Sequence, residues 1–125
     1  MDILEELVVQ TREFASRRDW LGCHSPKNLA MAIAAEAGEL AAEFRWLTIE
    51  GSYREQLTPA QYSDIRLEMA DVMIFLLGLS DVLDVDLAAA VRDKLTLNEV
   101  RFPVHGAARV DAGATVDPPT VVDEL

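Results

Sequence analysis

Apolar residues recur at intervals of three and four along much of the chain, a period that predicts helices, and no segment alternates as a strand does. We expect a first helix over residues 3–18, because Asp2 and Glu5 stand three positions apart as in a capping box. A second helix is expected over 26–46, where Ser25 supplies the N-cap and a proline follows at the first helical position. The segment between these helices is expected to be a connection.

A third helix is expected over residues 59–83, after a polar loop at 48–57. Thr58 precedes a proline and Gln61 stands at the third helical position, which repeats the start signal of the helix before it. From residue 69 to residue 79 this helix is apolar nearly all round. Such a helix is typical of the centre of a larger bundle or of a subunit interface.

The fourth helix is expected to begin after Asp84 or Asp86 and to stop before Pro103. Residues 104–125 are rich in Gly, Ala, Pro and Val without any period, which predicts a flexible tail that is mobile or lies over a partner subunit. The pattern therefore predicts an all-α fold, with a four-helix bundle domain over residues 1–103 followed by this tail.

Composition narrows the classes of function. The 125 residues fit one compact domain, and 50% of them are hydrophobic, which supports a real core. The 22 acidic and 11 basic residues give a net charge of −11, which argues against binding a nucleic-acid polymer. This charge does not exclude a small phosphate ligand, because acidic side chains can bind a metal ion that carries the phosphate.

The sequence also indicates a cellular setting. Cys23 is the one cysteine, which excludes an intrachain disulfide and a cysteine-based zinc site. The most apolar run, residues 72–79, is too short to cross a bilayer, so no membrane partner is expected. The first residues are acidic and amphipathic, unlike a signal peptide. We therefore expect a cytoplasmic protein.

Two pairs of acidic residues give the strongest chemical signal. Glu36 and Glu39 share one face of the second expected helix, and Glu68 and Asp71 share one face of the third. Their neighbours are apolar or small, so these carboxylates are costly to bury unless a cation compensates their charge. If the two helices pair as a hairpin, the four acids form one cluster. A hard divalent cation, Mg²⁺ or in its place Mn²⁺, is then the expected compensation.

Acidic residues on helices have two other common roles, as a solvated face and as ligands of a di-iron site. A solvated acidic helix face accounts for Glu43 and Glu55, but it accounts poorly for Asp71, which stands inside an apolar stretch. A carboxylate-bridged di-iron site would need Glu-x-x-His on two helices, and neither of the two histidines follows a glutamate at that spacing. The di-iron interpretation is therefore excluded.

The fourth expected helix carries Lys94, Asn98 and Arg101 at spacings of four and three, which places them in one stripe. Beside a metal site such a stripe would bind phosphate oxygens. A basic solvent-facing stripe that complements the helix dipole fits the spacing equally well. The spacing alone leaves both interpretations open.

Aromatic and polar residues at the ends of the second helix are further candidates. Trp20 precedes the helix and Trp46 closes it, where the two rings would stack on a nucleobase, although core packing or an oligomer contact is the commoner role of tryptophan. His24, Lys27 and Asn28 lie near the helix N-terminus, where anions bind readily. His24 alone would more often be a bystander.

The motif Glu36-Ala37-Gly38-Glu39, followed after a loop by Glu68-Met69-Ala70-Asp71, resembles the E-x-x-E…E-x-x-D signature of the MazG-like all-α NTP pyrophosphohydrolases. The resemblance extends over residues 3 to 105 and is greatest to the dCTP pyrophosphatase branch. The segments similar to that branch are Arg18-Asp19-Trp20, residues 24–29, residues 43–46, Asp86-Leu87, Lys94 and residues 98–105. A bare E-x-x-E is weak evidence, but this ordered set is specific.

The resemblance implies a Mg²⁺-dependent hydrolase that cleaves between the α- and β-phosphates of a nucleoside triphosphate, giving a monophosphate and pyrophosphate. Its substrate would be dCTP or a modified dCTP, and its role the removal of unwanted nucleotides. The implied metal ligands and catalytic residues are Glu36, Glu39, Glu68 and Asp71. Glu36 or Glu39 would be the general base. The implied residues of the base pocket are Trp20, His24 and Trp46, and the implied phosphate contacts are Lys94, Asn98 and Arg101. Lys27, Asn28 and Phe75 are further implied substrate contacts.

The family implies an obligate homo-oligomer, with dimers paired into tetramers, which suits the all-round apolar third helix. Phe75 departs from the family because close relatives often carry tyrosine there, so a hydrogen bond to sugar or phosphate is lost. Phe102 likewise replaces an expected tyrosine, at a position that is mostly structural.

Two alternative functions stay open at this point. The first is the same hydrolysis with another base, such as that of dUTP or of an oxidised purine triphosphate. The second is a non-catalytic helical interaction protein that retains the fold. The intact set of four carboxylates argues against this second alternative, because a decayed site should have lost at least one of them.

Overall fold

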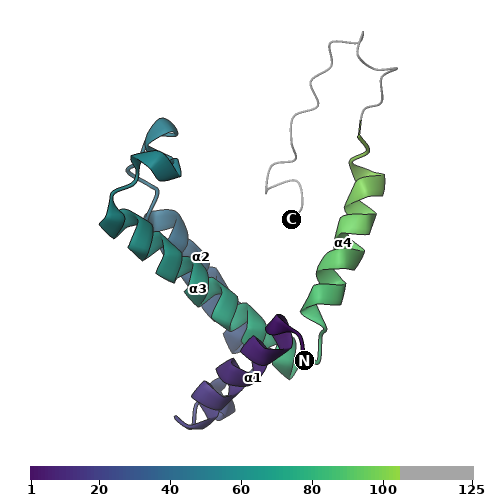
Figure 1. Cartoon of the computed structure of the whole chain (residues 1–125). Helices are drawn as coiled ribbons and strands as arrows, with labels where there is room; N and C mark the ends of the chain where they lie inside the picture. The colour runs from purple at the N-terminus through teal and green to yellow at the C-terminus, as the bar shows by residue number, and fades with distance from the viewer. Residues whose placement is uncertain (105–125) are drawn as a thin grey trace. The chain divides into compact units, whose positions relative to one another are not determined.

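The computed structural model describes residues 1–104, and within them the only regular elements are helices (Figure 1). The α-helices are α1 (Ile3–Ser16), α2 (Pro26–Ala42), α3 (Pro59–Val82) and α4 (Leu87–Arg101). Three short 3₁₀ turns lie in the connections: η1 (Leu21–Cys23), η2 (Glu50–Ser52) and η3 (Arg54–Gln56). The predicted all-α class with four helices is confirmed. The predicted tail lies outside the described residues, apart from Val104.

The helix starts follow the predicted capping chemistry. Asp2 and Glu5 form a reciprocal capping box at α1, and Thr58 and Gln61 form another at α3. Ser25 Oγ accepts a hydrogen bond from the amide of residue 28 at α2. Of the two caps predicted for α4, Asp84 and Asp86, the structure has Asp86, whose Oδ1 accepts a hydrogen bond from the Ala89 amide at 3.0 Å.

Helix α2 ends at Ala42, four residues earlier than predicted. Beyond it the backbone tightens: the amides of Phe44 and Arg45 donate to carbonyl oxygens three residues back, at 3.1 and 3.4 Å. Trp46 therefore lies in a turn after the helix. The apolar period that predicted a helix to this point is also satisfied by these tighter turns, which is why the boundary could not be located from sequence.

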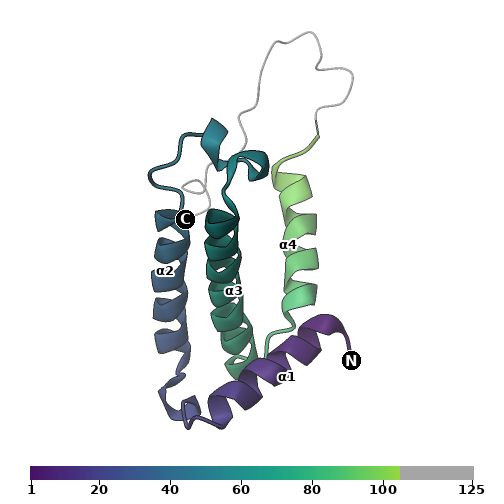
Figure 2. The ribbon, with the colours of Figure 1, turned by 60° about the vertical axis from the view of Figure 1, so that its left-hand side comes forward.

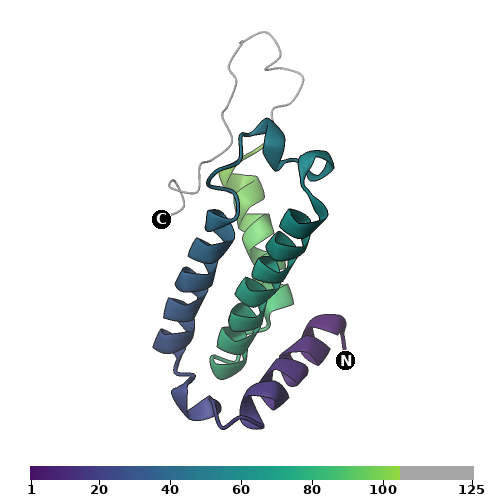
Figure 3. The ribbon, with the colours of Figure 1, turned by 90° about the vertical axis from the view of Figure 1, so that its left-hand side faces the viewer.

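Helices α2 and α3 lie side by side and antiparallel, with α1 across the C-terminal end of α3 (Figure 2; Figure 3). The apolar residues buried in this arrangement are Ala15, Leu29, Ile65 and Leu77. An ion pair also joins α1 to α3: the Arg12 guanidinium donates to both carboxylate oxygens of Asp81, at 2.9 and 2.7 Å. This hydrogen-bonded guanidinium holds the pKa of Asp81 below its usual range.

The described chain divides into two units, one of residues 1–90 and one that begins at residue 91. The first contains α1, α2, α3 and the first turn of α4, and the second contains the rest of α4. Within the described part of the chain, no helix combines the length and the hydropathy that a membrane span requires.

Candidate active site

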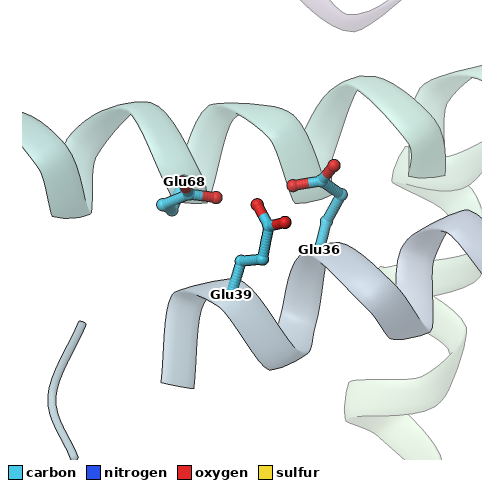
Figure 4. A group of neighbouring side chains, drawn as sticks. All are labelled: Glu36, Glu39 and Glu68. Carbon is cyan, nitrogen blue, oxygen red and sulfur yellow. The ribbon is translucent and has the colours of Figure 1, made fainter. Parts of the chain in front are cut away.

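Three of the four predicted metal ligands meet in the space between α2 and α3. Glu36 and Glu39 project from α2 toward Glu68 on α3 (Figure 4), and one carboxylate oxygen of each lies within 4.8 Å of the others. Because α2 packs antiparallel on α3, the two E-x-x-[ED] motifs lie opposite one another along the helix pair. The hairpin on which the sequence prediction depended is therefore present.

No side chain among residues 1–104 compensates the charge of this cluster. Glu36 Oε2 and Glu68 Oε2 are shielded from solvent and have no hydrogen-bond partner among the described residues. Burial raises the pKa of Glu36 and of Glu68, and the negative charges of Glu39 and Asp71 raise both pKa values further. A shielded carboxylate without a donor is unfavourable, so this arrangement requires an external cation or a proton.

The donor set fits a hard divalent cation. Every candidate ligand is a carboxylate oxygen, the class of ligand that Mg²⁺ and Mn²⁺ prefer. The two oxygens that lack a hydrogen bond are positioned on opposite helices, one on α2 and one on α3. The residues present therefore fit the predicted metal.

Asp71, the fourth predicted ligand, does not belong to this group of three. It lies one turn further along α3 and lines an adjoining cavity. Its charge nevertheless contributes to the raised pKa values of Glu36 and Glu68, so it is electrostatically part of the cluster. Asp71 thus stands at the junction between the carboxylates and the cavity.

The cavity has a volume of about 300 Å³ and is mostly apolar. It lies within the first unit, and four predicted site residues line it: Trp20, His24, Asp71 and Phe75. Two aromatic rings, a histidine and a carboxylate therefore converge, although 51 residues separate Trp20 from Asp71 in the chain. Such a combination of apolar walls and a few polar groups is typical of a small-molecule site.

The C-terminal cap of α1 positions Trp20. Asp19 adopts a left-handed backbone conformation with φ of 56°, and the Trp20 amide donates to the Ala15 carbonyl at 3.0 Å. This cap turns the chain so that the Trp20 ring meets the Phe14 ring edge-on, with centroids 5.8 Å apart. The Arg18 guanidinium covers the Phe14 ring, with its central carbon 3.5 Å from the ring centroid.

Lys27 and Asn28 do not line this cavity. The Asn28 side chain instead donates to the Cys23 carbonyl at 2.9 Å, which ties the η1 turn to the start of α2. The structure thus gives Asn28 a local role in shaping the chain beside His24. Lys27 is exposed on the first turn of α2.

Trp46 is 86% exposed and lies beyond the C-terminal end of α2, whereas His24 precedes its N-terminal end. The 17 residues of α2 separate the two ends by about 25 Å, at roughly 1.5 Å per residue. The Arg45 guanidinium lies 5.3 Å from the Trp46 ring. Within one chain, therefore, Trp46 is far from the cavity that Trp20 lines.

Lys94, Asn98 and Arg101 lie on α4 in the second unit. Asn98 Oδ1 is shielded from solvent and accepts no hydrogen bond from the described residues. The Arg101 guanidinium lies 5.0 Å from the Phe102 ring.

Several residues that line the cavity were not predicted from the sequence, notably Thr11, Arg12, Ile74 and Asp81. Ile74 and Asp81 continue the face of α3 that carries Asp71, so helical spacing is the signal that could have found them. No local pattern relates Arg12 to Asp81, which stand 69 positions apart.

No family model matches the chain. The chain is 37% identical over 102 residues to dCTP pyrophosphatase 1 of Homo sapiens, and equally so to that of Bos taurus. These matches cover 82% of this chain but 60% of each relative, so the chain spans less than two thirds of their length. A crystal structure of a pyrophosphatase from Archaeoglobus fulgidus is 38% identical, with a TM-score of 0.75 over 83% of this chain and 95% of that one.

The all-helical fold, with its antiparallel pair of α2 and α3, places the chain in the structural class of this pyrophosphatase. The chain belongs to the MazG-like all-α NTP pyrophosphohydrolases, and its similarity is to their dCTP pyrophosphatase branch. The resemblance stated from the motifs is thereby confirmed.

Proposed function

We propose that the protein is a Mg²⁺-dependent nucleoside triphosphate pyrophosphohydrolase that acts on dCTP or a modified dCTP. The observation that carries this proposal is the pair of shielded, unpartnered oxygens on Glu36 and Glu68, next to an aromatic cavity that Asp71 adjoins. The names of the curated relatives, dCTP pyrophosphatase 1, support the choice of cytosine.

In this proposal Glu36, Glu39, Glu68 and Asp71 hold the metal, with Mn²⁺ as a substitute. The bound metal would supply charge neutralisation at the phosphates and a more acidic water. Glu36 or Glu39 accepts the proton of the attacking water, whose oxygen bonds to the α-phosphorus. The bond from that phosphorus to the bridging oxygen breaks, and pyrophosphate leaves with the electron pair. The products are a nucleoside monophosphate and pyrophosphate.

The remaining predicted contacts are assigned within the same proposal. Trp20 and Phe75 form the walls around the base and the sugar. The apolar Phe75 ring offers the sugar no hydroxyl. His24 contributes a polar group at the cavity wall, while Lys27 contributes charge nearby. Lys94, Asn98 and Arg101 remain proposed phosphate contacts on α4.

We further propose a homo-oligomer, a dimer or tetramer, in a cytoplasmic setting. Few apolar side chains are fully buried, and α3 leaves Leu67 and Met69 more than half exposed, at 54% and 57%. If Trp46 contributes to base binding, it must do so in a second copy, because its own cavity lies at the other end of α2. A site completed by a partner subunit explains why so large a ring is 86% exposed here.

The test is a panel of deoxy- and ribonucleoside triphosphates assayed with and without Mg²⁺ for release of pyrophosphate and monophosphate. The proposal expects metal-dependent release that is greatest with cytosine deoxynucleotides. Activity that peaks on dUTP or an oxidised purine would keep the reaction and replace the substrate. Absence of release from the whole panel, with folded protein, would favour the non-catalytic interaction protein.

A further inference from the structure

The aromatic cavity ends at an ion pair that the proposed reaction does not use. Arg12 on α1 and Asp81 on α3 both line it, and Nε and Nη2 of Arg12 donate to the two oxygens of Asp81. The pair is not sealed in the protein interior, because the Arg12 side chain is 49% exposed and that of Asp81 is 22% exposed. Both groups also line a second cavity, and their place in the wall of the aromatic cavity puts them beside a ligand bound there.

The cavity runs along one face of α3. Asp71, Phe75, Gly78 and Asp81 all line it, and their spacings of four, three and three keep them on the same side of the helix. The ten residues from Asp71 to Asp81 span about 15 Å along the axis. One end of the cavity thus adjoins the carboxylate cluster, and the other end is the ion pair. A nucleotide whose phosphates lie at the carboxylate end directs its base toward the ion pair.

The pair still has hydrogen-bonding capacity. A guanidinium has five N–H donors, and Arg12 uses two of them on Asp81 and none on any other described residue. A carboxylate has about four acceptor positions, and Arg12 occupies two of those on Asp81. The pair therefore presents an acceptor and a donor side by side at the end of a mostly apolar cavity.

We propose that Arg12 and Asp81 are specificity-determining residues that recognise the polar edge of the nucleobase, an inference that rests on the proposed function. Asp81 accepts a hydrogen bond from an exocyclic amino group, and Arg12 donates to the adjacent ring nitrogen. Cytosine presents this amino group beside an acceptor nitrogen. Uracil presents a carbonyl oxygen beside an N–H group, which places an acceptor against the Asp81 carboxylate and a donor against Arg12. The pair therefore selects cytosine over uracil.

The experiment compares kcat/KM for dCTP and dUTP in the unaltered 125-residue chain and three variants. The first variant exchanges the pair (Arg12→Asp with Asp81→Arg), which keeps an ion pair but reverses donor and acceptor. The second, Asp81→Asn, preserves shape and removes the charge. The control is Arg17→Ala, which removes an exposed ion pair with Glu13 on the same helix, outside the cavity.

We expect the unaltered protein to prefer dCTP by about tenfold or more, the range that a charge-assisted hydrogen bond supports. The exchanged pair should lower the dCTP-to-dUTP ratio by about tenfold to a hundredfold, Asp81→Asn should lower it by less, and Arg17→Ala should leave it unchanged. A second readout is the ratio of Kd values for dCMP and dUMP, which does not depend on catalysis.

An unchanged ratio in active, folded variants would overturn this inference and leave the proposed function intact, with the pair serving only to join α1 to α3. Failure of the unaltered protein to hydrolyse any nucleotide would overturn the proposed function and this inference with it. If the exchanged pair fails to fold, Asp81→Asn decides the outcome by the same two ratios.

Discussion

Helix α3 carries acidic side chains at two levels, and their electrostatic environments are opposite. At the first level, Glu68 faces Glu36 and Glu39 on α2, has an oxygen without a hydrogen bond, and has a raised pKa. Ten residues beyond Asp71, Asp81 faces Arg12 on α1, has both oxygens hydrogen-bonded, and has a lowered pKa. The same helix therefore presents one unpaired carboxylate level and one paired level.

The difference comes from the helix that packs against each level. Helix α2 brings further acids to Glu68, and α1 brings a guanidinium to Asp81. Where the protein supplies its own counter-charge, it gains a structural contact between helices. Where the described residues gather like charges without a counter-charge, a bound cation or a proton must offset the repulsion, which is the expected signature of a functional site.

The largest effect is expected from a substitution in the unpaired carboxylate cluster. Glu68→Gln keeps the shape of the side chain and removes a proposed metal ligand, so we expect kcat/KM for dCTP to fall by about a hundredfold to a thousandfold. Pyrophosphate release measures it. Glu55→Gln is the matched control, because Glu55 is an exposed acid outside the cluster and should stay within twofold of the unaltered protein. A fall of only a few fold in Glu68→Gln would remove Glu68 from the proposed ligands.

The same substitution should have the opposite effect on stability. Glu68→Gln relieves repulsion within the cluster, so the metal-free variant should melt at a higher temperature than the metal-free unaltered protein. Mg²⁺ at one hundred times its Kd should stabilise the unaltered protein by about 2.7 kcal/mol and so raise its melting temperature. The same Mg²⁺ concentration should raise the melting temperature of the variant by less. Equal Mg²⁺ responses in both proteins would contradict a metal site at Glu68.

The two levels should also respond oppositely to pH in the metal-free protein. The pKa values of Glu36 and Glu68 are raised above the unfolded value of about 4.3, so between these values the folded state binds more protons than the unfolded chain. The contribution of Glu36 and Glu68 to stability therefore falls as the pH rises from about 4.3 through their raised pKa values. Asp81 has a lowered pKa, so its contribution is complete above about 3.9 and is lost as pH falls through its folded value.

Urea unfolding across a pH series measures both responses. Metal-free protein should be more stable near pH 5 than at pH 7, and should lose stability below about pH 4. Glu68→Gln should flatten the upper part of this profile and leave the lower part unchanged. An upper part that stays equally steep in the variant would show that Glu68 does not carry it.

The sequence predicted the unpaired level better than the paired one, for a physical reason. Glu36, Glu39 and Glu68 lie in short local motifs, and the helix starts at Ser25 and Thr58 determine where those motifs fall. Antiparallel packing of consecutive helices then brings the motifs together. The helices and this part of the site could therefore be predicted.

The ion pair could not be predicted in the same way. Arg12 and Asp81 stand 69 positions apart on helices that are not consecutive, and each alone resembles an ordinary surface charge. The end of α2 was misplaced for a related reason, because an apolar period does not distinguish a helix from the tighter turns that follow Ala42. Information about which helix packs against which is absent from local patterns.

A smaller effect is predicted for the paired level. Arg12→Ala removes the contact between α1 and α3, and because both side chains are partly exposed we expect a loss of about 1 kcal/mol in the free energy of unfolding. Arg17→Ala, which removes a more exposed pair, should cost less than half as much. Urea unfolding at pH 7 distinguishes the two, and equal losses would show that the Arg12 pair adds nothing beyond an ordinary surface contact.

The smallest effect concerns the backbone that follows Asp81. Asp84 adopts a left-handed conformation with φ of 53°, and beyond it the Val85 amide donates to the Ser80 carbonyl at 2.8 Å. Asp84→Gly should stabilise the protein by at most about 0.5 kcal/mol, because glycine relieves the strain but gains entropy in the unfolded chain. Asp84→Ala should destabilise it by about 1 kcal/mol. Both variants remove the same charge, so the difference between their unfolding free energies isolates backbone conformation from electrostatics at this end of α3. If the two variants had equal free energies of unfolding, substitution at Asp84 would act through the lost charge. The electrostatic contrast between the two ends of α3 would then include Asp84.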